Sequence, residues 1–324
     1  MTQVMVFAEN NGEKVHPVSY ELLAKGRELA EKLGGELTAA LLSGNEIDTG
    51  ELIFRGADRV YFGKDEALAD PIETVHKEAF VQVIEEAGPE VILIGATNFG
   101  RSLAPRVAMA LDTSLTADCT GLDIDEDKNF IQIRPAFSGN ILAHIKSRTS
   151  PQLATVRYKE FTEAPRETER QGEVMEVELY LDRGNQGQVE ILGEQRGEQV
   201  NLEDAEVVVA GGRGLKKEED FELIGELAEV LDGKVGASRP LVDDGWIGRE
   251  HQVGYSGRRV KPGIYFACGI SGQSQHLAGM KESDTIIAIN NDPSAPIFEY
   301  ADYGLVGDLY EIVPELIRQL KEGN

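Results

Sequence analysis

Short apolar runs alternate with amphipathic segments along the first part of the chain. Residues 4–8 (VMVFA) and 91–95 (VILIG) are apolar runs of strand length. Between them, residues 19–35 place Leu22, Leu29 and their apolar neighbours on one side of a helix that stops at glycine. Continuous apolar strands between amphipathic helices indicate a parallel sheet that is covered on both faces.

The pattern changes after Asp118. Residues 130–147 and 152–161 alternate apolar and polar positions and contain turn residues, so we expect an antiparallel extension or hairpin there. Residues 183–204 are dominated by glycine, glutamine and glutamate, a composition that indicates a domain boundary. We therefore predict two domains, residues 1–195 and residues 196–324.

Strand and helix patterns alternate more regularly in the second half. The apolar runs of strand length are residues 206–212, 234–237, 264–268, 285–290 and 304–308. A helix after the first run carries Phe221, Ile224, Ala228 and Leu231 on one face, and a final helix begins at Leu309. The predicted fold class is α/β, with two domains that are each built on a mainly parallel, doubly wound sheet.

Chemically useful residues follow each of these C-terminal strands. The strand ends carry residues 211–214 (GGRG), Ser238 with Arg239, residues 269–276 (GISGQSQH), residues 290–292 (NND) and Asp308. Ligands bind at the carboxyl edge of an open parallel sheet. Glycine lets the backbone approach a phosphate closely, and helix N-termini favour an anion. These loops together predict a site for a large, dinucleotide-like ligand.

The loop of residues 269–276 allows several interpretations. Ser271, Ser274 and His276 suggest a hydrolase, but GISGQ is not the GxSxG motif that a nucleophile elbow requires. We therefore expect the Ser271 hydroxyl to cap the following helix. His276 is either a solvated helix residue or a hydrogen-bond donor to a polar ring, and the pattern alone leaves both open.

Arginines stand at two of the strand ends in this acidic chain. Arg213 and Arg239 lie among glycines and small residues, where a pyrophosphate or an electron-rich ring would lie. A guanidinium offers fork-like donors with a fixed charge, so we favour a ligand role for both. For Arg258, a surface salt bridge is the simpler interpretation.

Charge and cysteine content exclude several function classes. The 324 residues include 32 Lys and Arg against 57 Asp and Glu, a formal net charge of −25. Such a surface repels nucleic acids and anionic membranes. Cys119 and Cys268 form no CxxC motif, which argues against a thiolate zinc site or an iron–sulfur cluster. No secretory signal and no apolar run long enough for membrane insertion is visible, so we expect a cytoplasmic protein.

Three long segments resemble the alpha subunit of electron transfer flavoproteins. They are residues 235–246 (VGASRPLVDDGW), 252–280 (QVGYSGRRVKPGIYFACGISGQSQHLAGM) and 286–316 (IIAINNDPSAPIFEYADYGLVGDLYEIVPEL). The first half resembles the same family more loosely, in residues 115–123 (LTADCTGLD), 133–143 (IRPAFSGNILA) and 152–161 (QLATVRYKEF). The resemblance therefore covers the whole chain.

The resemblance implies a flavin adenine dinucleotide (FAD) held mainly by a Rossmann-like C-terminal domain. It puts Ser256 near flavin N5 and His276 near the pyrimidine carbonyl O2, and it assigns no catalytic or metal-binding residue. The implied cofactor contacts are Arg213, Ser238, Arg239, Gln252, Val253, Gly254, Tyr255, Ser256, Gly269, Ser271, Gly272, Gln273, Ser274, Gln275, His276, Asn290, Asp308 and Leu309.

The resemblance also implies partners and a role. The N-terminal domain would dock a beta subunit to form a heterodimer, and the flavin domain would swivel on residues 183–204. The pair would accept electrons from flavin dehydrogenases, such as acyl-CoA dehydrogenases, and pass them to a downstream acceptor without converting a substrate.

Three alternatives remain open at this stage. One is the subunit of an electron-bifurcating flavoprotein, in which a second flavin in the beta subunit takes hydride from NADH. Another is an NAD-dependent oxidoreductase, since the same sheet edge suits a nicotinamide dinucleotide. The third is a structural subunit that has lost its ligand.

Overall fold

The protein divides into two compact units in the computed structural model. The structure describes residues 2–136, 141–181, 189 and 200–323. One unit spans Met1–Leu192 and the other Gly193–Asn324, and the two are described separately. The boundary predicted between residues 195 and 196 lies outside the described residues. In the described ranges, no helix is long and apolar enough to cross a membrane.

A seven-stranded sheet forms the centre of the N-terminal unit. Its strand order is β10-β3-β2-β1-β4-β9-β5, and every neighbouring pair is parallel. Its strands are β1 (Gln3–Ala8), β2 (Glu36–Ser43), β3 (Arg59–Lys64), β4 (Val91–Gly95), β5 (Leu115–Cys119), β9 (Gln152–Val156) and β10 (Glu173–Val177).

Helices cover both faces of this sheet, as the sequence predicts. The helices of the unit are α1 (Pro17–Leu33), α2 (Gly50–Phe54), the 3-10 turn η1 (Glu66–Leu68), α3 (Glu73–Ala87) and α4 (Asn98–Ala110). Val4 and Val6 of β1 share a core with α1, whereas Met5 and Phe7 share a second core with α3 and α4. Because side chains alternate along a strand, both halves of the alternation are buried and the strand is apolar throughout.

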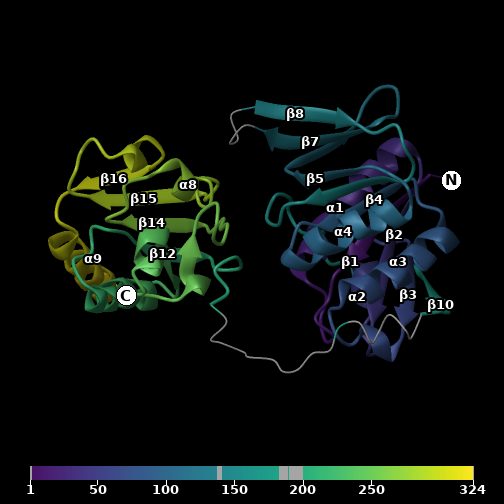
Figure 1. Ribbon diagram of the computed structural model, residues 1–324, viewed down its shortest axis with the longest axis horizontal. Coiled ribbons are helices and arrows are strands. Elements are labelled where there is room, and N and C mark those ends of the chain that lie inside the picture. The colour runs from purple at the N-terminus through teal and green to yellow at the C-terminus, as the bar shows by residue number, and fades with distance from the viewer. Residues whose placement is uncertain (1, 137–140, 182–188, 190–199, 324) are drawn as a thin grey trace. The chain divides into compact units, whose positions relative to one another are not determined.

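A separate antiparallel sheet extends this unit. It contains β6 (Gly121–Ile124), β7 (Phe130–Ala136) and β8 (Ile141–Lys146), and Figure 1 shows β7 and β8 as neighbouring arrows. The predicted hairpin is confirmed for these strands. It is wrong for residues 152–161, because β9 lies parallel between β4 and β5 in the large sheet. Leu153 and Ala154 are buried in the two separate cores on opposite faces of the sheet, as expected for a strand inside a covered sheet.

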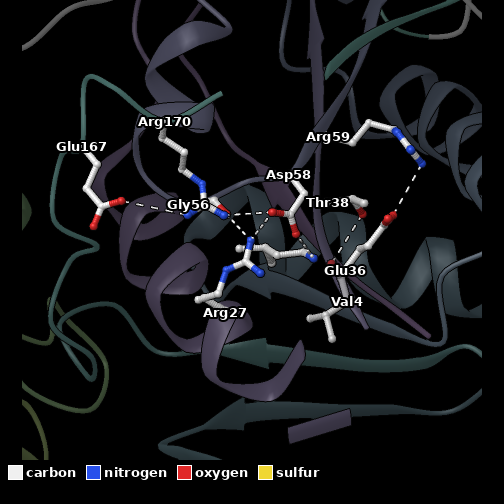
Figure 2. A network of polar contacts seen from close by, with 10 residues as sticks. Val4, Arg27, Glu36, Thr38, Gly56, Asp58, Arg59, Glu167 and Arg170 are labelled. Atoms are coloured by element: carbon white, nitrogen blue, oxygen red, sulfur yellow. Dashed lines mark hydrogen bonds and ion pairs between the residues drawn. The ribbon is translucent and has the colours of Figure 1, made fainter. Parts of the chain in front are cut away.

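A charged network attaches the chain before β10 to the large sheet (Figure 2). Asp58 accepts hydrogen bonds from Arg170 at 2.8 Å and from the Leu37 backbone N–H at 3.0 Å, and it pairs with Arg27 at 2.7 Å. These partners hold the pKa of the Asp58 carboxyl below its ordinary value although burial opposes them. Arg27 also donates to the Gly56 carbonyl, so one carboxylate joins α1, β2 and the segment that leads to β10.

The C-terminal unit is built on a six-stranded parallel sheet. Its strand order is β13-β12-β11-β14-β15-β16, and Figure 1 shows β14, β15 and β16 side by side. The strands are β11 (Val207–Gly211), β12 (Lys234–Ser238), β13 (Gln252–Val253), β14 (Ile264–Cys268), β15 (Thr285–Asn290) and β16 (Tyr303–Val306).

Both faces of this second sheet are also covered. The helical segments are η3 (Glu218–Asp220), α6 (Phe221–Val230), α7 (Arg239–Asp243), η4 (Arg249–His251), α8 (Ser274–Leu277), η5 (Pro296–Glu299) and α9 (Leu309–Gly323). α6 and α9 share a core with Val207 and Val209, whereas Val208 and Ala210 pack with α8 and η5. The predicted fold class, two doubly wound α/β units, is confirmed.

Candidate functional site

The strand order of the C-terminal sheet reverses between β11 and β14. From β11 the chain adds β12 and β13 on one side, and from β14 it adds β15 and β16 on the other. Loops that leave such a switch point at the carboxyl edge diverge, and the crevice between them is where open α/β sheets bind ligands. Here these loops begin at Gly212 and Gly269.

Glycines bring the backbones of these two loops into direct contact. The Gly212 N–H donates to the Cys268 carbonyl and the Gly214 N–H to the Gly269 carbonyl, each at 2.9 Å. A Cβ on Gly212 would lie 2.4 Å from the Gly269 oxygen, and one on Gly214 would lie 2.6 Å from the Gly269 Cα. Any side chain would therefore force the loops apart, and Gly269 also has a φ of 65° that favours glycine.

The first glycine loop presents Arg213 to solvent. Arg213 is exposed, and within the described residues it forms no hydrogen bond or ion pair. The loop behind it is held in place: the Lys216 N–H donates to the Tyr310 hydroxyl at 2.7 Å and to Asp220 at 3.1 Å. The Tyr310 hydroxyl donates to Asp220 as well. Burial and the Asp220 carboxylate raise the pKa of Tyr310 to about 12, so it stays a donor.

The end of β12 carries Ser238 and Arg239. Ser238 is buried and precedes α7, where its extended backbone forms the N-cap position. Arg239 is exposed and pairs with Asp243 one turn later, at 3.1 Å. Its charge is therefore partly balanced by its own helix, unlike that of Arg213.

The turn after β13 contains the residues predicted to lie at the flavin ring. Gln252 and Val253 are buried, whereas Tyr255 and Ser256 are exposed. The Gln252 side-chain amide donates to the Ser256 hydroxyl at 3.0 Å. Gly254 has a φ of 144°, and its N–H donates to the Arg258 carbonyl at 3.0 Å, which closes the turn. Arg258 pairs with Glu203 at 3.7 Å, as expected for a surface salt bridge.

Backbone hydrogen bonds join this turn to the segment around α8. The Tyr255 N–H donates to the Gln275 carbonyl and the Val260 N–H to the Gly279 carbonyl, both at 2.7 Å. Gln273, Ser274 and Gln275 are exposed on the same segment. The turn after β13 and the segment around α8, which are both predicted to contact the cofactor, are thus held together by hydrogen bonds.

His276 points into the protein rather than to solvent. Its side chain is 7% exposed, and its Nε2 lies 2.9 Å from the hydroxyl of Tyr265, which is fully buried. Burial lowers the pKa of His276 to about 4, against a smaller opposing effect of the Val253 backbone. Its Nδ1 is buried and has no partner of hydrogen-bonding geometry among the described residues. The interpretation of His276 as a solvated helix residue is wrong.

The capping role predicted for Ser271 is also wrong. α8 begins later, with Gln273 at its N-cap position and without a side-chain cap. Gly272 intervenes with a φ of 83° and lies against Ile297. Ser271 contributes its carbonyl, which accepts from the Ile297 N–H at 3.1 Å. This bond turns the chain before the helix starts and leaves the Ser271 side chain exposed.

The last three of the implied cofactor contacts, which the resemblance puts at the adenosine part, have clear roles within the fold. Asn290 is buried: its amide donates to the Ile270 carbonyl at 2.9 Å and accepts from the Asp292 N–H at 3.0 Å. Asp308 accepts from the Tyr310 N–H at 2.9 Å at the start of α9. Leu309 is buried, and its Cδ2 lies behind the paired glycines 214 and 269. Any cofactor contact of these three residues remains a prediction.

Sequence reasoning missed Tyr265 and Tyr310 as parts of this site. Tyr265 lies in an apolar strand and looks like a core residue in the sequence, and Tyr310 lies far along the chain from the loop that it holds. Only the fold brings them to His276 and Lys216. Gly212 and Gly214 did carry a signal, since the GGRG sequence follows a strand directly.

Two family models match the chain. The electron transfer flavoprotein domain matches residues 4–182, and the electron transfer flavoprotein FAD-binding domain matches residues 201–281. The electron transfer flavoprotein subunit alpha of Thermoanaerobacterium thermosaccharolyticum is 45% identical over 98% of both chains.

The chain belongs to the electron transfer flavoprotein alpha-subunit family. Other similar proteins are the LctC subunit of the Acetobacterium woodii lactate dehydrogenase (NAD(+),ferredoxin), 43% identical over 98% of this chain and 77% of the relative, and Protein FixB of Azotobacter vinelandii, 42% identical over 98% and 91%. The C-terminal unit is therefore an FAD-binding domain, as the sequence predicts.

The residues at the sheet edge fit such a dinucleotide. Gly212, Gly214 and Gly269 let the two loops at the switch point meet without side chains between them, and glycine-rich loops of this kind suit a closely approaching pyrophosphate. Arg213 offers a positive charge beside them that no described residue pairs with, and the Nδ1 atom of His276 is a buried polar atom without a partner of good geometry in the described chain. The site thus combines phosphate-binding chemistry with one unsatisfied group.

Replacing Gly212 with alanine tests the approach of the two loops. We expect Gly212→Ala to lower the free energy of unfolding by roughly 1–3 kcal/mol, because the added Cβ overlaps the Gly269 carbonyl. FAD affinity should fall with it. The matched control is Gly225→Ala on α6, where an added Cβ meets nothing within 4 Å; helix propensity should make it neutral or more stable. Urea unfolding measures the stability and flavin fluorescence the FAD affinity of the two variants. Equal stability and affinity of the two would contradict the close contact of the loops.

Proposed function

We propose that this chain is the FAD-carrying subunit of a heterodimer that accepts electrons from flavin dehydrogenases and passes them to a further redox partner. Family membership supports electron transfer, and the matched FAD-binding domain supports the cofactor. The observation that carries the proposal is the pair of glycine loops at the switch point, with the exposed Arg213 on the first loop and unpaired in the described part of the chain.

The chain's own residues would bind and orient the cofactor, which supplies the electron chemistry when bound. Arg213 would bind the pyrophosphate beside the backbone N–H groups of the glycine loops. Ser238, Arg239 and Ser256 would lie at the flavin end, and Asn290, Asp308 and Leu309 at the adenosine end. The positive charge of Arg239 and a donor from His276 would favour the negative charge that a flavin gains on reduction.

Among the described residues, the serines of the loop before α8 have no base beside them, which argues for a carrier rather than a hydrolase. Ser271 and Ser274 are exposed and neither forms a hydrogen bond with His276 within the described residues, whereas His276 is occupied by Tyr265. A serine without a base within reach is a weak nucleophile.

Substituting Arg213 tests the phosphate-binding role. We expect Arg213→Gln to weaken FAD binding by about tenfold or more, because a charge-assisted hydrogen bond contributes about 1.5–3 kcal/mol and 1.4 kcal/mol corresponds to tenfold. The loss should shrink at high salt, since an exposed charge is screened. Arg318→Gln is the control, because the ion pairs of Arg318 within the described residues are with Glu315 and Glu322 on its own helix. Titration of apoprotein with FAD decides; identical affinities of both variants would refute the role.

We also propose that the N-terminal unit docks the beta subunit through its antiparallel sheet. β8 is paired on one side only, and it exposes Ile141 and Leu142, at 53% and 58%. Large exposed apolar side chains on a strand edge are typical of interaction surfaces.

A double substitution on β8 tests this docking surface. Ile141→Ser with Leu142→Ser should weaken binding of the beta subunit by at least tenfold, because two apolar anchors are lost. The control is Met109→Ser on α4, a residue that is equally apolar and more exposed. Co-expression and size-exclusion chromatography measure the heterodimer. Undiminished pairing of the β8 variant would place the interface elsewhere.

Electron bifurcation is a second candidate, favoured by the similarity to LctC of a lactate dehydrogenase (NAD(+),ferredoxin). If this chain acts in such a complex, the purified heterodimer should contain two FAD molecules and NADH should reduce them. Anaerobic titration with NADH, followed by the flavin absorbance, is the measurement. A single flavin that NADH leaves oxidised would exclude bifurcation and leave the simple carrier intact.

We also propose a cytoplasmic location. Cys119 and Cys268 are both free and buried, and burial raises the pKa of each thiol to about 12. Unpaired thiols of this kind suit a reducing compartment. Fractionation of cells with an antibody to the chain tests the assignment, which recovery from the periplasm would overturn.

A further inference from the structure

A buried pair formed by Tyr265 and His276 leaves one ring nitrogen of His276, Nδ1, without a partner of good hydrogen-bonding geometry among the described residues. The Tyr265 hydroxyl is completely buried on β14, and His276 Nε2, at 2.9 Å, is its one hydrogen-bonding partner within the described residues. His276 Nδ1 is buried without a partner. A buried phenol normally donates its O–H to an acceptor, so this arrangement limits which nitrogen of the imidazole carries the proton.

Counting donors and acceptors selects one tautomer. A neutral imidazole has one N–H and one acceptor nitrogen, and burial keeps His276 neutral at physiological pH. If Nε2 carried the proton, the Tyr265 O–H would have no acceptor and Nδ1 would be a second unmatched group. If Tyr265 donates to Nε2, the phenol is satisfied and Nδ1–H is the single group left over. The second arrangement costs less, because each buried unmatched group carries a desolvation penalty.

The position of the His276 ring in the fold indicates which group this donor could bind. His276 lies on α8, which is bonded through the Gln275 carbonyl to the turn that carries Ser256. The Val253 backbone at the end of β13 is a weak hydrogen-bond acceptor for His276, which opposes the effect of burial on the imidazole pKa. The imidazole therefore lies between the buried strand β14 and the turn at the carboxyl edge, where the proposed function places the flavin.

We propose that Tyr265 is a positioning residue for the bound flavin: by donating to Nε2 it holds His276 as the Nδ1–H tautomer, so that Nδ1 donates to an acceptor on the cofactor. The inference rests on the proposed function. Tyr265 is completely buried and hydrogen-bonds His276, so it would act on the cofactor through His276. Without its hydroxyl, the imidazole is free to turn an unprotonated nitrogen toward a carbonyl, and two lone pairs then face each other.

The first experiment reads the tautomer directly in the unaltered protein. Histidine labelled with a heavy nitrogen isotope is introduced into the full chain paired with its beta subunit, and nitrogen–proton correlation spectra distinguish Nδ1–H from Nε2–H. The chain has 5 histidines, so a His276→Gln variant assigns the signal. We expect the Nδ1–H form with and without FAD. Finding Nε2–H in the wild-type protein overturns the proposal, whether or not any variant folds.

The second experiment removes the hydroxyl and retains the ring. Tyr265→Phe should turn the His276 signal into a mixture of tautomers, lower FAD affinity by about tenfold, the value of one hydrogen bond, and shift the flavin midpoint potential to more negative values. Tyr303→Phe is the control, because Tyr303 is exposed at the start of β16 and its loss should change none of the three. A purely structural role for Tyr265 predicts lower stability with an unchanged tautomer and potential.

The outcomes separate this inference from the proposed function. A wild-type heterodimer that binds no FAD refutes the proposed function, whatever the tautomer of His276. A wild-type protein that binds FAD, together with a Tyr265→Phe protein that keeps the tautomer and the potential, refutes only the positioning role of Tyr265.

Discussion

The direct backbone contact between the loops after β11 and β14 is the constraint on which the C-terminal site depends. Gly212 and Gly214 meet Gly269 so closely that no Cβ fits between them. The contact fixes where both loops leave the sheet, and the buried side chain of Leu309 packs against Gly214 and Gly269. The crevice at the switch point is therefore shaped by the main chain, which side-chain motion does not change.

This edge of the sheet carries positive charge although the protein as a whole is negatively charged. The protein carries a net charge of −25, yet Arg213 stands unpaired beside the glycines in the described structure. The charge of Arg239 is partly balanced by an ion pair with Asp243, and burial keeps His276 neutral. An isolated cation in an acidic surface attracts the phosphates of a ligand locally, while the overall field disfavours polyanions such as nucleic acids. A neutral imidazole stabilises developing negative charge as a hydrogen-bond donor without a net charge of its own.

Much of the fold was readable from local patterns, and the exceptions have physical reasons. The apolar runs of β1, β4, β11 and β14 indicated buried parallel strands because both of their faces are covered. β9 was misassigned to the antiparallel extension because its neighbours in the sheet, β4 and β5, are separated from it in sequence. Ser271 was misread as a helix cap because the positive φ of Gly272 and the bond to Ile297 turn the chain before α8 begins.

The sequence by itself determined the fold class and, through its resemblance to a family, the kind of cofactor, and it predicted the carboxyl edge as the place of binding. These follow from hydrophobic period, from glycines after strands and from contiguous motifs, which are all local properties of the chain. Only the tertiary structure decided that His276 is buried against Tyr265, that Tyr310 and Asp220 hold the Arg213 loop, and that Arg213 rather than Arg239 is the unpaired cation. Tyr265 and Tyr310 act across gaps of 11 and 94 residues, and no local pattern encodes which distant donor a buried acceptor will meet.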